Sequence, residues 1–512
     1  MLIIDWIIFV TVLLILGGVA LYFKKYVKDV SSFAIAGRKT RIWLGLSNQF
    51  SGGLGLVAIA YVAQQGFCHG AGYIWIALFN SMIGIILFGI CGFGIQRLRA
   101  SKAMTSGQYL EMRYSRKLRL AVGLVCGFGG VINMAVFPVT GAKFLCWFLK
   151  WPSSFEMFGY EFSTIAVMTA LMIAAAVFFA VACGQVGVIV TDYLQSIIIM
   201  AGLFGLVFII MKDVGITQIQ TAMTTQVGTG AFNPLESGKY GWIWLLWVFA
   251  AAIWSPFCFG PVISKNASAN NPKTVRLMTL ISLIFGQGKN MIMLFLGLGA
   301  LAVLGQTLPE GFDQQTYNLA ATPIYLGQIS PPILCGLLVS AFIAAFISTN
   351  DSYLLSWGVI WVNDFICPLL PGKLSTRQHL LLLRIVIILI GLFLYFFGVL
   401  YTIEDSVLEF LLLTGTMWLG GGIAVVFGLY WKRACTYGAY TAVATTCILP
   451  IIHLTLQKCW PEYNIPAKIA GVITIAAAVI LLVVISQISK GKTKFVDYSA
   501  AVADAEKHSI ND

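Results

Sequence analysis

Residues 43–66 read WLGLSNQFSGGLGLVAIAYVAQQG, an apolar run of membrane-spanning length interrupted in its middle by SGGLG. A second interruption lies at 253–264, IWSPFCFGPVIS, where two prolines and a glycine break another apolar run. Glycine and proline loosen helices, and interruptions at matching places are typical of membrane proteins built from two inverted repeats. Close helix packing and a simple proline kink are the alternative explanation of these residues.

The rest of the chain is also a membrane sequence. Of its 512 residues, 59% are hydrophobic and 10% are charged, whereas soluble proteins have roughly 45–50% apolar and about 25% charged residues. A soluble enzyme is therefore excluded, and apolar stretches of about 20 residues predict roughly thirteen helices. We expect these helices near 4–23, 43–66, 72–95, 120–149, 162–183, 185–211, 241–264, 277–304, 332–365, 378–401, 406–430, 436–457 and 466–488. The two interrupted helices are the second and the seventh, which predicts five-helix repeats in spans 2–6 and 7–11.

The basic residues predict the orientation of the chain. The net charge is +12, but Lys and Arg lie in short loops between apolar runs, which argues against a nucleic-acid partner. Most of these loops share one side if the N-terminus is outside, as the positive-inside rule requires of cytoplasmic loops. The C-terminus is then cytoplasmic, in a cell membrane (plasma or inner) that the chain crosses many times. Nothing in the sequence implies a protein partner.

This orientation divides the chain into six segments. We expect a leading helix and cytoplasmic loop (1–41), a first five-helix repeat (42–211), an extracellular loop (212–240), a second five-helix repeat (241–430), two additional helices (431–488) and a cytoplasmic tail (489–512). The tail is short and mixed in charge, and we expect it to be disordered.

Charged residues inside the spans are the candidates for a functional site, because each is costly in hydrocarbon. Asp351 lies on the ninth span within AFISTNDSYLLSWG, where Ser348, Thr349 and Ser352 add three hydroxyls within about one and a third turns. Hard cations prefer several oxygen ligands, which this cluster offers together with Asp192 of another span. Alternatively, the hydroxyls bond back to their own helix. The sequence leaves both interpretations open.

Four stretches, taken together, resemble the sodium:solute symporter family, whose core is the LeuT-like five-plus-five inverted repeat. They are FAIAGRKTRIWLGLSNQFSGGLGL (33–56), GQVGVIVTDYLQ (184–195), ISTNDSYLLSWGVIWVNDF (347–365) and GLYWKRACTYGA (428–439). They occur in the family's order along the chain. The resemblance implies an all-α polytopic membrane protein that is a transporter and not an enzyme.

The resemblance also implies where sodium binds. The principal site would take backbone carbonyls of Ser47, Phe50 and Ala345 and the hydroxyls of Ser348 and Thr349. Some family members bind a second sodium ion further along the same helix. The matching residues here are Asp192, Asp351 and Ser352 with Ser348, and the two carboxylates would hold either that ion or a proton.

The family's solute site is matched less closely. Proline-transporting members have an aspartate in place of Gln49, and sugar-transporting members have other residues at Gly53 and Leu54, next to Gly52 in the break. Lys289 falls about where sugar-binding members keep a lysine, and Gln287 and Asn290 beside it offer hydrogen bonds. Trp254, Phe257 and Phe259 offer a stacking wall or a gate. Lys289 implies either an anionic solute or an ion pair with an aspartate of another helix.

The resulting hypothesis is sodium-coupled symport of a small polar organic solute into the cell by alternating access. The alternative is a proton-coupled carrier that uses Asp192 and Asp351. A membrane sensor and a membrane-embedded enzyme are the weakest hypotheses, since the chain shows no signalling domain and no catalytic constellation.

Overall fold

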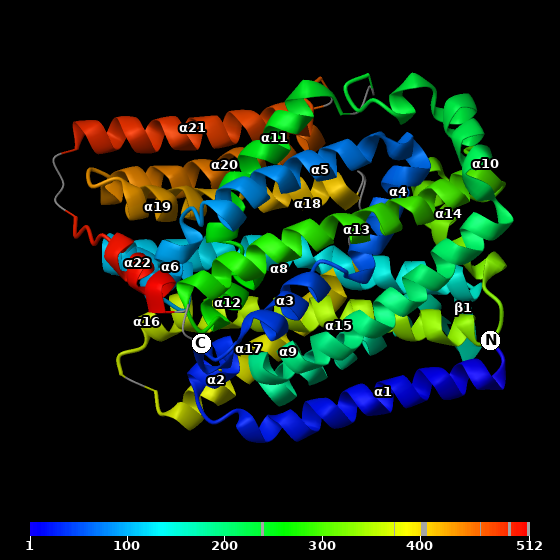
Figure 1. Ribbon diagram of the computed structural model, residues 1–512, viewed down its shortest axis with the longest axis horizontal. Helices are drawn as coiled ribbons and strands as arrows, with labels where there is room; N and C mark the ends of the chain where they lie inside the picture. The colour runs from blue at the N-terminus through cyan, green and yellow to red at the C-terminus, as the bar shows by residue number, and fades with distance from the viewer. Residues whose placement is uncertain (237–239, 373, 401–406, 461, 490–492, 509–512) are drawn as a thin grey trace.

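The computed structural model describes residues 1–236, 240–372, 374–400, 407–460, 462–489 and 493–508, and most of them are helical (Figure 1). Part of the expected loop 212–240, of the second five-helix repeat 241–430, of the additional helices 431–488 and of the tail 489–512 therefore lies outside the described residues. The helices are α1 (Ile3–Phe23), α2 (Val30–Ile35), α3 (Ile42–Ser51), α4 (Leu56–His69), α5 (Tyr73–Gly84), α6 (Ile95–Ala100), α7 (Ser106–Arg113), α8 (Arg116–Leu149), α9 (Thr164–Asp213), α10 (Gly215–Ala222), α11 (Gly241–Trp254), α12 (Gly260–Ser268), α13 (Pro272–Leu304), α14 (Gln314–Ile329), α15 (Leu334–Ile360), α16 (Cys367–Leu369), α17 (Thr376–Leu400), α18 (Val407–Thr416), α19 (Leu419–Tyr430), α20 (Thr436–Cys459), α21 (Ala467–Ile488) and α22 (Ser499–His508).

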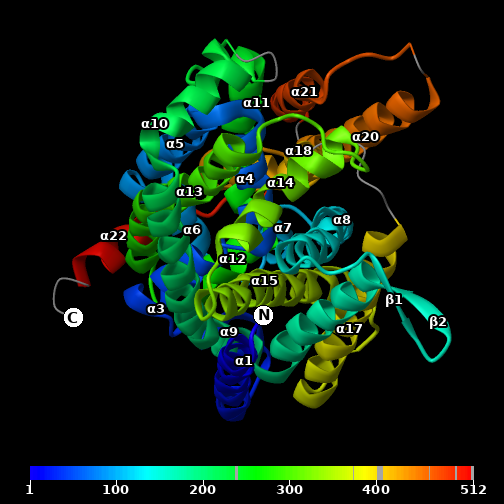
Figure 2. The same ribbon diagram turned by 90° about the vertical axis from the view of Figure 1, so that its right-hand side faces the viewer.

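The long helices run side by side along the longest axis, and Figure 2 shows the bundle turned to face its right-hand end. Within the described residues, nine helices are long and apolar enough to cross a membrane, or up to eleven if each bent pair is one span. One of the nine, Thr164–Asp213 with 50 residues, is long enough for two spans of about 20 residues each, and another, Leu56–Ile90, comprises the two helices α4 and α5 on either side of a turn at Gly70–Gly72. The count is compatible with thirteen crossings.

The interruptions predicted from glycine and proline are present. Helix α3 ends at Ser51 and α4 begins at Leu56, on either side of the glycines. Helices α11 and α12 meet at an angle of 47° across the proline-rich segment. A break within a span leaves backbone groups without partners in their own helix, so both breaks are places where the backbone can meet a ligand.

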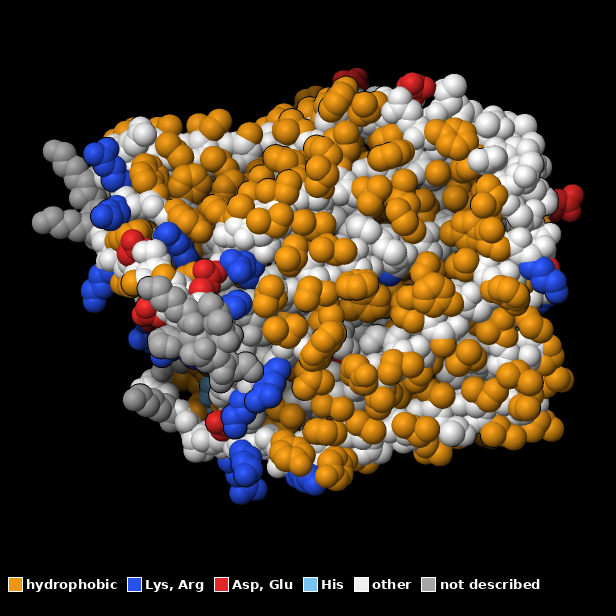
Figure 3. Space-filling model, viewed as in Figure 1, with side chains coloured by type: hydrophobic (Ala, Val, Ile, Leu, Met, Phe, Trp, Pro, Cys, Tyr) orange, Lys and Arg blue, Asp and Glu red, His pale blue; other side chains and the backbone are white. Residues whose placement is uncertain are grey.

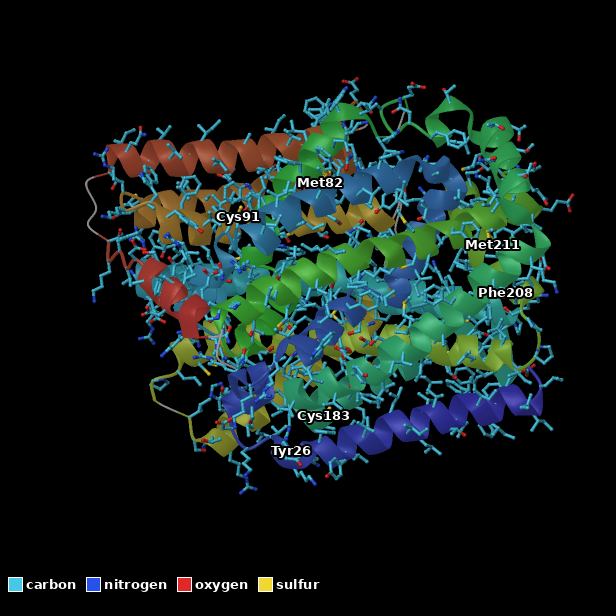
Figure 4. All side chains as sticks on the ribbon, in the orientation of Figure 1. Tyr26, Met82, Cys91, Cys183, Phe208 and Met211 are labelled. Carbon is cyan, nitrogen blue, oxygen red and sulfur yellow. The ribbon has the colours of Figure 1, made fainter. Side chains whose placement is uncertain are left out.

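The predicted boundary inside 162–211 also lies where expected. Gly184 has φ 52° and ψ −162° and bends α9 sharply. In Figure 4, Cys183 beside this bend lies near the lower centre, whereas Phe208 and Met211 lie toward the right-hand side. The second half of α9 therefore runs from the lower centre of the bundle toward its right-hand side.

Small residues let the central helices pack closely. A Cβ added at Gly297 of α13 would lie 1.9 Å from the backbone oxygen of Ala63 on α4, and one at Gly66 would lie 2.5 Å from that of Leu294. Close backbone approach through small residues is a main source of helix association in membranes. These contacts fix α13 against α4, the second half of the first broken span.

A buried carboxylate joins the first helix to α15. Asp5 of α1 is 1% exposed and accepts hydrogen bonds from the backbone N–H groups of Ile333 at 2.8 Å and Gly336 at 3.0 Å. These groups belong to the start of α15, where an acceptor satisfies orphan donors and complements the helix dipole. Asp5 thereby fixes α1 beside the helix that carries the candidate cation site.

Three segments differ from the sequence-based expectations. The expected loop 212–240 contains α10, and residues 154–163 form an antiparallel hairpin of β1 (Ser154–Met157) and β2 (Tyr160–Ser163). The tail prediction is wrong for 499–508: α22 is a helix packed on α6 and α13. Glu506 of α22 bonds to Arg276 at 2.7 Å and to Gln96 at 3.2 Å, contacts across the fold that composition cannot indicate.

Side-chain types separate over the surface seen in Figure 3. Hydrophobic side chains cover the middle and right of this face, and blue Lys and Arg side chains gather at its left end. A broad apolar belt with charges concentrated at an end is the pattern of a protein that spans a bilayer.

Candidate functional site

The break between α3 and α4 faces the polar cluster of α15. A Cβ at Gly55, the residue before α4, would lie 2.4 Å from Thr349 Oγ1 and 2.9 Å from Thr349 Cβ. Such distances are too short for any larger residue, so glycine is required here because α15 comes so close. The hydroxyl of Thr349 thus lies directly against the interrupted backbone.

Most side-chain oxygens of the α15 cluster have no hydrogen-bond partner among the residues that the structure describes. Ser348, Thr349, Asp351 and Ser352 are each at most 3% exposed. Within the described part of the chain, Thr349 Oγ1, Ser352 Oγ and both carboxylate oxygens of Asp351 accept or donate no hydrogen bond. Buried polar atoms nearly always have partners, so this group of orphans indicates a bound species. The alternative, hydroxyls bonded back to their own helix, does not describe Thr349 or Ser352.

Asp192 joins the cluster from α9. Ser348 Oγ donates to Asp192 Oδ1 at 2.5 Å, while Asp192 Oδ2 has no hydrogen bond to any residue that the structure describes. Ser47 of α3 lies near the same part of α9, with its hydroxyl 3.3 Å from that of Ser196. Ala345 is fully buried one turn before Ser348. The structure therefore brings together parts of α3, α9 and α15 around buried oxygens.

Two lysine ammonium groups lie at the end of α3. Lys289 Nζ donates to the backbone oxygen of Phe50 at 3.1 Å, and Lys265 Nζ donates to that of Asn48 at 2.6 Å. Both carbonyls belong to the last turn of α3, where cations complement the helix dipole. Sodium at the Phe50 carbonyl would share that oxygen with Lys289, which its two lone pairs permit.

Lys265 is the residue that the sequence analysis missed. The seventh span was expected to end at Ser264, one residue earlier, so Lys265 was placed in a loop. In the structure α12 continues to Ser268, and Lys265 is 5% exposed. The sequence did contain a signal for Lys265. The proline break interrupts the apolar stretch, so the helix has to continue past Ser264 toward the C-terminus to complete the span.

A cavity of about 420 Å³ lies between the two breaks. Its lining includes Gln49, Gly52 and Gly53 at the first break and Phe259 and Lys265 at the second. The Lys289 ammonium is adjacent, because a Cβ at Gly53 would lie 2.2 Å from its Nζ. The volume suits a small organic molecule of a few hundred daltons or less.

The polar wall of the cavity is pre-organised around Gln49. Its Nε2 donates to Asn266 Oδ1 at 3.1 Å, and its Oε1 accepts from Ser282 Oγ at 2.8 Å. Both ends of the amide are therefore engaged by protein groups from α12 and α13. Gln49 positions the wall and leaves its remaining hydrogen-bonding capacity for a solute.

The aromatic residues divide into two groups. Phe259 stacks on Trp418 with ring centroids 5.4 Å apart and packs edge-on against Tyr353, which also lines the cavity. Trp254 instead stacks on Phe427 at 6.1 Å, and the buried Phe257 packs against Phe88 and Phe93. Of the three aromatics considered from sequence, Phe259 is the one at the cavity.

The other expected solute residues lie outside the cavity lining. Leu54 is fully buried in the hydrophobic core. Gln287 Nε2 donates to Ser81 Oγ and to the backbone oxygen of Leu283, and Gln287 lines a separate, mostly apolar hollow. Asn290 is half-buried next to Lys289 on α13. Sequence proximity to Lys289 does not place these side chains at the cavity.

Comparison with known proteins yields one family and several relatives. The model of the sodium:solute symporter family matches residues 33–445. A sodium/proline symporter 2 of Staphylococcus saprophyticus is 22% identical, covering 91% of this chain and 90% of that protein. A sodium/pantothenate symporter of Haemophilus influenzae is also 22% identical, over 75% of this chain and 77% of that protein.

Solved structures show the same fold. A sodium-coupled sialic acid symporter in a substrate-bound, outward-open state has a TM-score of 0.80 at 18% identity and covers 97% of this chain and 100% of that one. A nucleobase-cation-symport-1 family transporter has a TM-score of 0.51 at 13% identity, with coverage of 94% and 100%. The fold is the LeuT-like inverted repeat.

Proposed function

The chain belongs to the sodium:solute symporter family and is a sodium-coupled transporter, not an enzyme, and we propose that its solute is a small carboxylate held between the two helix breaks. The main support for the coupling site is the position of the Thr349 hydroxyl. It has no hydrogen-bond partner among the described residues and lies against Gly55. An ion at this place would join α15 to the break beside the cavity.

We propose that the principal sodium site uses the expected ligands. These are the backbone carbonyls of Ser47, Phe50 and Ala345 and the hydroxyls of Ser348 and Thr349. Five oxygens suit a hard monovalent cation, and the nearby Asp192 supplies negative charge through its contact with Ser348. The orphaned oxygens of Asp351 and Ser352 offer a neighbouring position for positive charge.

Positive charge at the cavity supports an anionic solute. Lys289 forms no ion pair with a carboxylate of the described residues, so an intramolecular aspartate partner is not supported. Helix α4 also begins at the break, and helix N-termini attract anions. Proline and pantothenate, the solutes in the names of two relatives, both carry carboxylates.

Coupling then follows from affinity differences between two conformations. Sodium bound between the α3–α4 break and α15 would stabilise the arrangement that presents the Gly52–Gly53 backbone and Lys289 to the solute. A ligand shifts a conformational equilibrium by its differential affinity for the two states. Loss of sodium on the low-sodium side would release the solute there.

The direction of transport rests on the orientation of the chain. We propose that the N-terminus is outside and the C-terminus cytoplasmic in the plasma or inner membrane. The gathering of Lys and Arg at one end of the bundle (Figure 3) supports this assignment through the positive-inside rule.

Thermal unfolding of the purified protein in sodium, potassium or choline chloride tests the ion site. A ligand that binds only the folded state raises the melting temperature, so we expect a sodium-specific rise that Ser348→Ala with Thr349→Ala abolishes. Ser340→Ala is the matched control, because its hydroxyl on the same helix bonds to Gly336 O. Equal melting temperatures in the three salts would contradict the site.

Uptake into proteoliposomes tests the solute class. We expect sodium-driven uptake of a small carboxylate, with proline and pantothenate as the first probes, and competition by carboxylates but not by their amides or alcohols. Lys289→Met removes a charge-assisted contact of about 1.5–3 kcal/mol, so KM should rise by roughly 10- to 150-fold. Equal competition by the uncharged analogues would refute the carboxylate assignment.

A further inference from the structure

A second polar cavity lies beside the end of α1, where the chain leaves its first span. Its volume is about 510 Å³, and within the described structure it shares no lining residue with the solute cavity. Its walls come from the segment 23–40, the start of α3 and the part of α9 that follows the bend at Gly184. Tyr26, which lines it, lies below Cys183 of α9 in Figure 4. Figure 3 shows Lys and Arg side chains at the lower left, where Figure 1 places α2.

Two lysines supply positive charge to this cavity. Lys28 and Lys39 both line it, and neither forms an ion pair within 4.0 Å with a carboxylate of the described residues. Asp29 is the acidic residue of the lining, but its Oδ1 accepts from the backbone N–H of Ser32 at 2.7 Å and so caps α2. Two ammonium groups and one carboxylate leave the lining with a net positive charge. The lysines are thus available to an anionic ligand.

The chain around the cavity is also basic and lies at a membrane surface. Tyr22 and Tyr26, at and just after the end of α1, are 57% and 47% exposed, and tyrosines at the ends of spans lie at the level of the lipid headgroups. Clusters of about four to eight basic residues beside a membrane helix attract anionic lipids. Residues 24–41 contain one acidic residue and six basic ones, which are Lys24, Lys25, Lys28, Arg38, Lys39 and Arg41.

The wall that α9 contributes is apolar. It consists of Val186, Ile189 and Val190, and Leu44 of α3, another lining residue, is 41% exposed. A water-soluble anion gains nothing from such a wall, whereas an acyl chain gains from each methylene that it buries. Basic side chains combined with an apolar wall therefore fit an anionic lipid better than a free phosphate or carboxylate.

We propose that this cavity binds one anionic phospholipid, with its phosphate at Lys28 and Lys39 and the first carbons of its chains along α9. The positive-inside rule explains why basic residues gather at this end of the bundle, but it requires no cavity in which they meet an apolar wall. The site is separate from the proposed sodium and solute sites, so it adds a ligand to those of the transport cycle.

The bound lipid would contact the segment that connects the two broken spans. Thr40 lines the cavity, and its backbone donates to Ser268 O at 3.1 Å and accepts from Asn270 N–H at 3.0 Å, at and just after the end of α12. Leu44 of the lining lies on α3, the first half of the first broken span. The lipid is therefore expected to stabilise the fold around both breaks.

Native mass spectrometry of the delipidated full-length protein in detergent tests the site. Dioleoyl phosphatidylglycerol and dioleoyl phosphatidylcholine have the same chains and differ in net charge, so titrating each separates the headgroup from the chains. We expect one phosphatidylglycerol to bind per chain at concentrations at which phosphatidylcholine does not bind. It should also raise the melting temperature more than phosphatidylcholine does, since a ligand of the folded state stabilises that state.

Two sets of variants separate the charge from the wall. Lys28→Gln with Lys39→Gln should weaken phosphatidylglycerol binding by roughly 30-fold, because each basic residue beside an anionic lipid contributes a factor of about five. Lys117→Gln with Arg377→Gln is the matched control, because it removes the same charge from exposed residues of α8 and α17 outside the lining, and it should bind like the unaltered protein. Val190→Trp fills the apolar wall, keeps both lysines and should also weaken binding. If the double lysine variant does not fold, each single variant should weaken binding by about fivefold.

Three results would overturn the proposal. Equal affinity for the two lipids would show that charge is not recognised. Unchanged binding in the lysine variants or in Val190→Trp would place the lipid elsewhere on the protein. Displacement of phosphatidylglycerol by an equal concentration of glycerol 1-phosphate would assign the cavity to a soluble anion instead.

Discussion

Gly55→Ala tests whether the contact between the first break and α15 forms the sodium site. The added Cβ would lie 2.4 Å from Thr349 Oγ1, 2.9 Å from Cβ and 3.0 Å from Cγ2. Ordinary contact between such atoms is at about 3.5 Å, so the hydroxyl must retreat by roughly 1 Å. A retreat of that size removes one ligand from a cation.

The expected cost follows from the lost ligand. A polar contact to a charged partner contributes about 1.5–3 kcal/mol, which corresponds to a rise of roughly 10- to 150-fold in the sodium concentration for half-maximal stabilisation. The assay is the melting temperature measured across a sodium titration at constant ionic strength. Gly288→Ala is the matched control, because a Cβ there meets nothing within 4 Å.

A double variant separates a specific effect from general damage. Gly55→Ala and Thr349→Ala act on the same contact, so together they should cost little more than either alone. The reasoning is refuted if folded Gly55→Ala protein responds to sodium within twofold of the unaltered protein. Additive losses would show that the two residues act at separate places.

Three further outcomes are expected. Asp5→Ala removes the buried acceptor at the start of α15 and should lower the free energy of unfolding by about 1–3 kcal/mol, measured by thermal or denaturant unfolding; an unchanged stability would contradict the role of this carboxylate. Gly297→Ala places a Cβ 1.9 Å from Ala63 O and should sharply reduce the yield of folded protein in size-exclusion chromatography, whereas normal yield would show that α13 and α4 can separate. Glu506→Gln weakens a partly exposed pair with Arg276, so it should change global stability by less than about 1 kcal/mol but speed proteolysis of the tail; equal cleavage rates would contradict docking of α22 through this residue.

The sequence predicted the features that depend on local composition. Glycines at 52–55 and prolines at 256 and 261 identified both breaks, because the loss of helix at such residues is a local effect. The boundary expected between the apolar stretches 162–183 and 185–211 coincides with Gly184, where α9 bends. The helix α22 was not predicted, since ten polar and small residues form a stable helix only through contacts such as Glu506 with Arg276.

The candidate site was predictable in its chemistry but not in its geometry. The oxygens of Ser348, Thr349 and Asp351 were evident from the span that carries them, whereas their meeting with Gly55 depends on how α15 packs. Lys265 was missed because hydropathy set the end of the seventh span at Ser264, four residues before α12 ends at Ser268. Trp254 and Phe257 lie outside the cavity lining, since aromatic side chains face many directions and only packing distinguishes a cavity wall from a core, and their contact with the solute stays a prediction.

The Asp5 contact constrains the order in which the helices assemble during synthesis. The carboxylate and its partner at Ile333 are separated by 328 residues, and at about 5–20 residues per second the ribosome needs roughly 16–66 s to make them. Helix α1 can pack on α9, which is made earlier, but its Asp5 contact has to wait for α15. Its surface allows this, since only 17% of its most apolar window is buried even in the finished fold. The first helix synthesised thus completes its contacts late, and a substitution at Asp5 would remove the late contact with α15 while leaving the earlier packing on α9 in place.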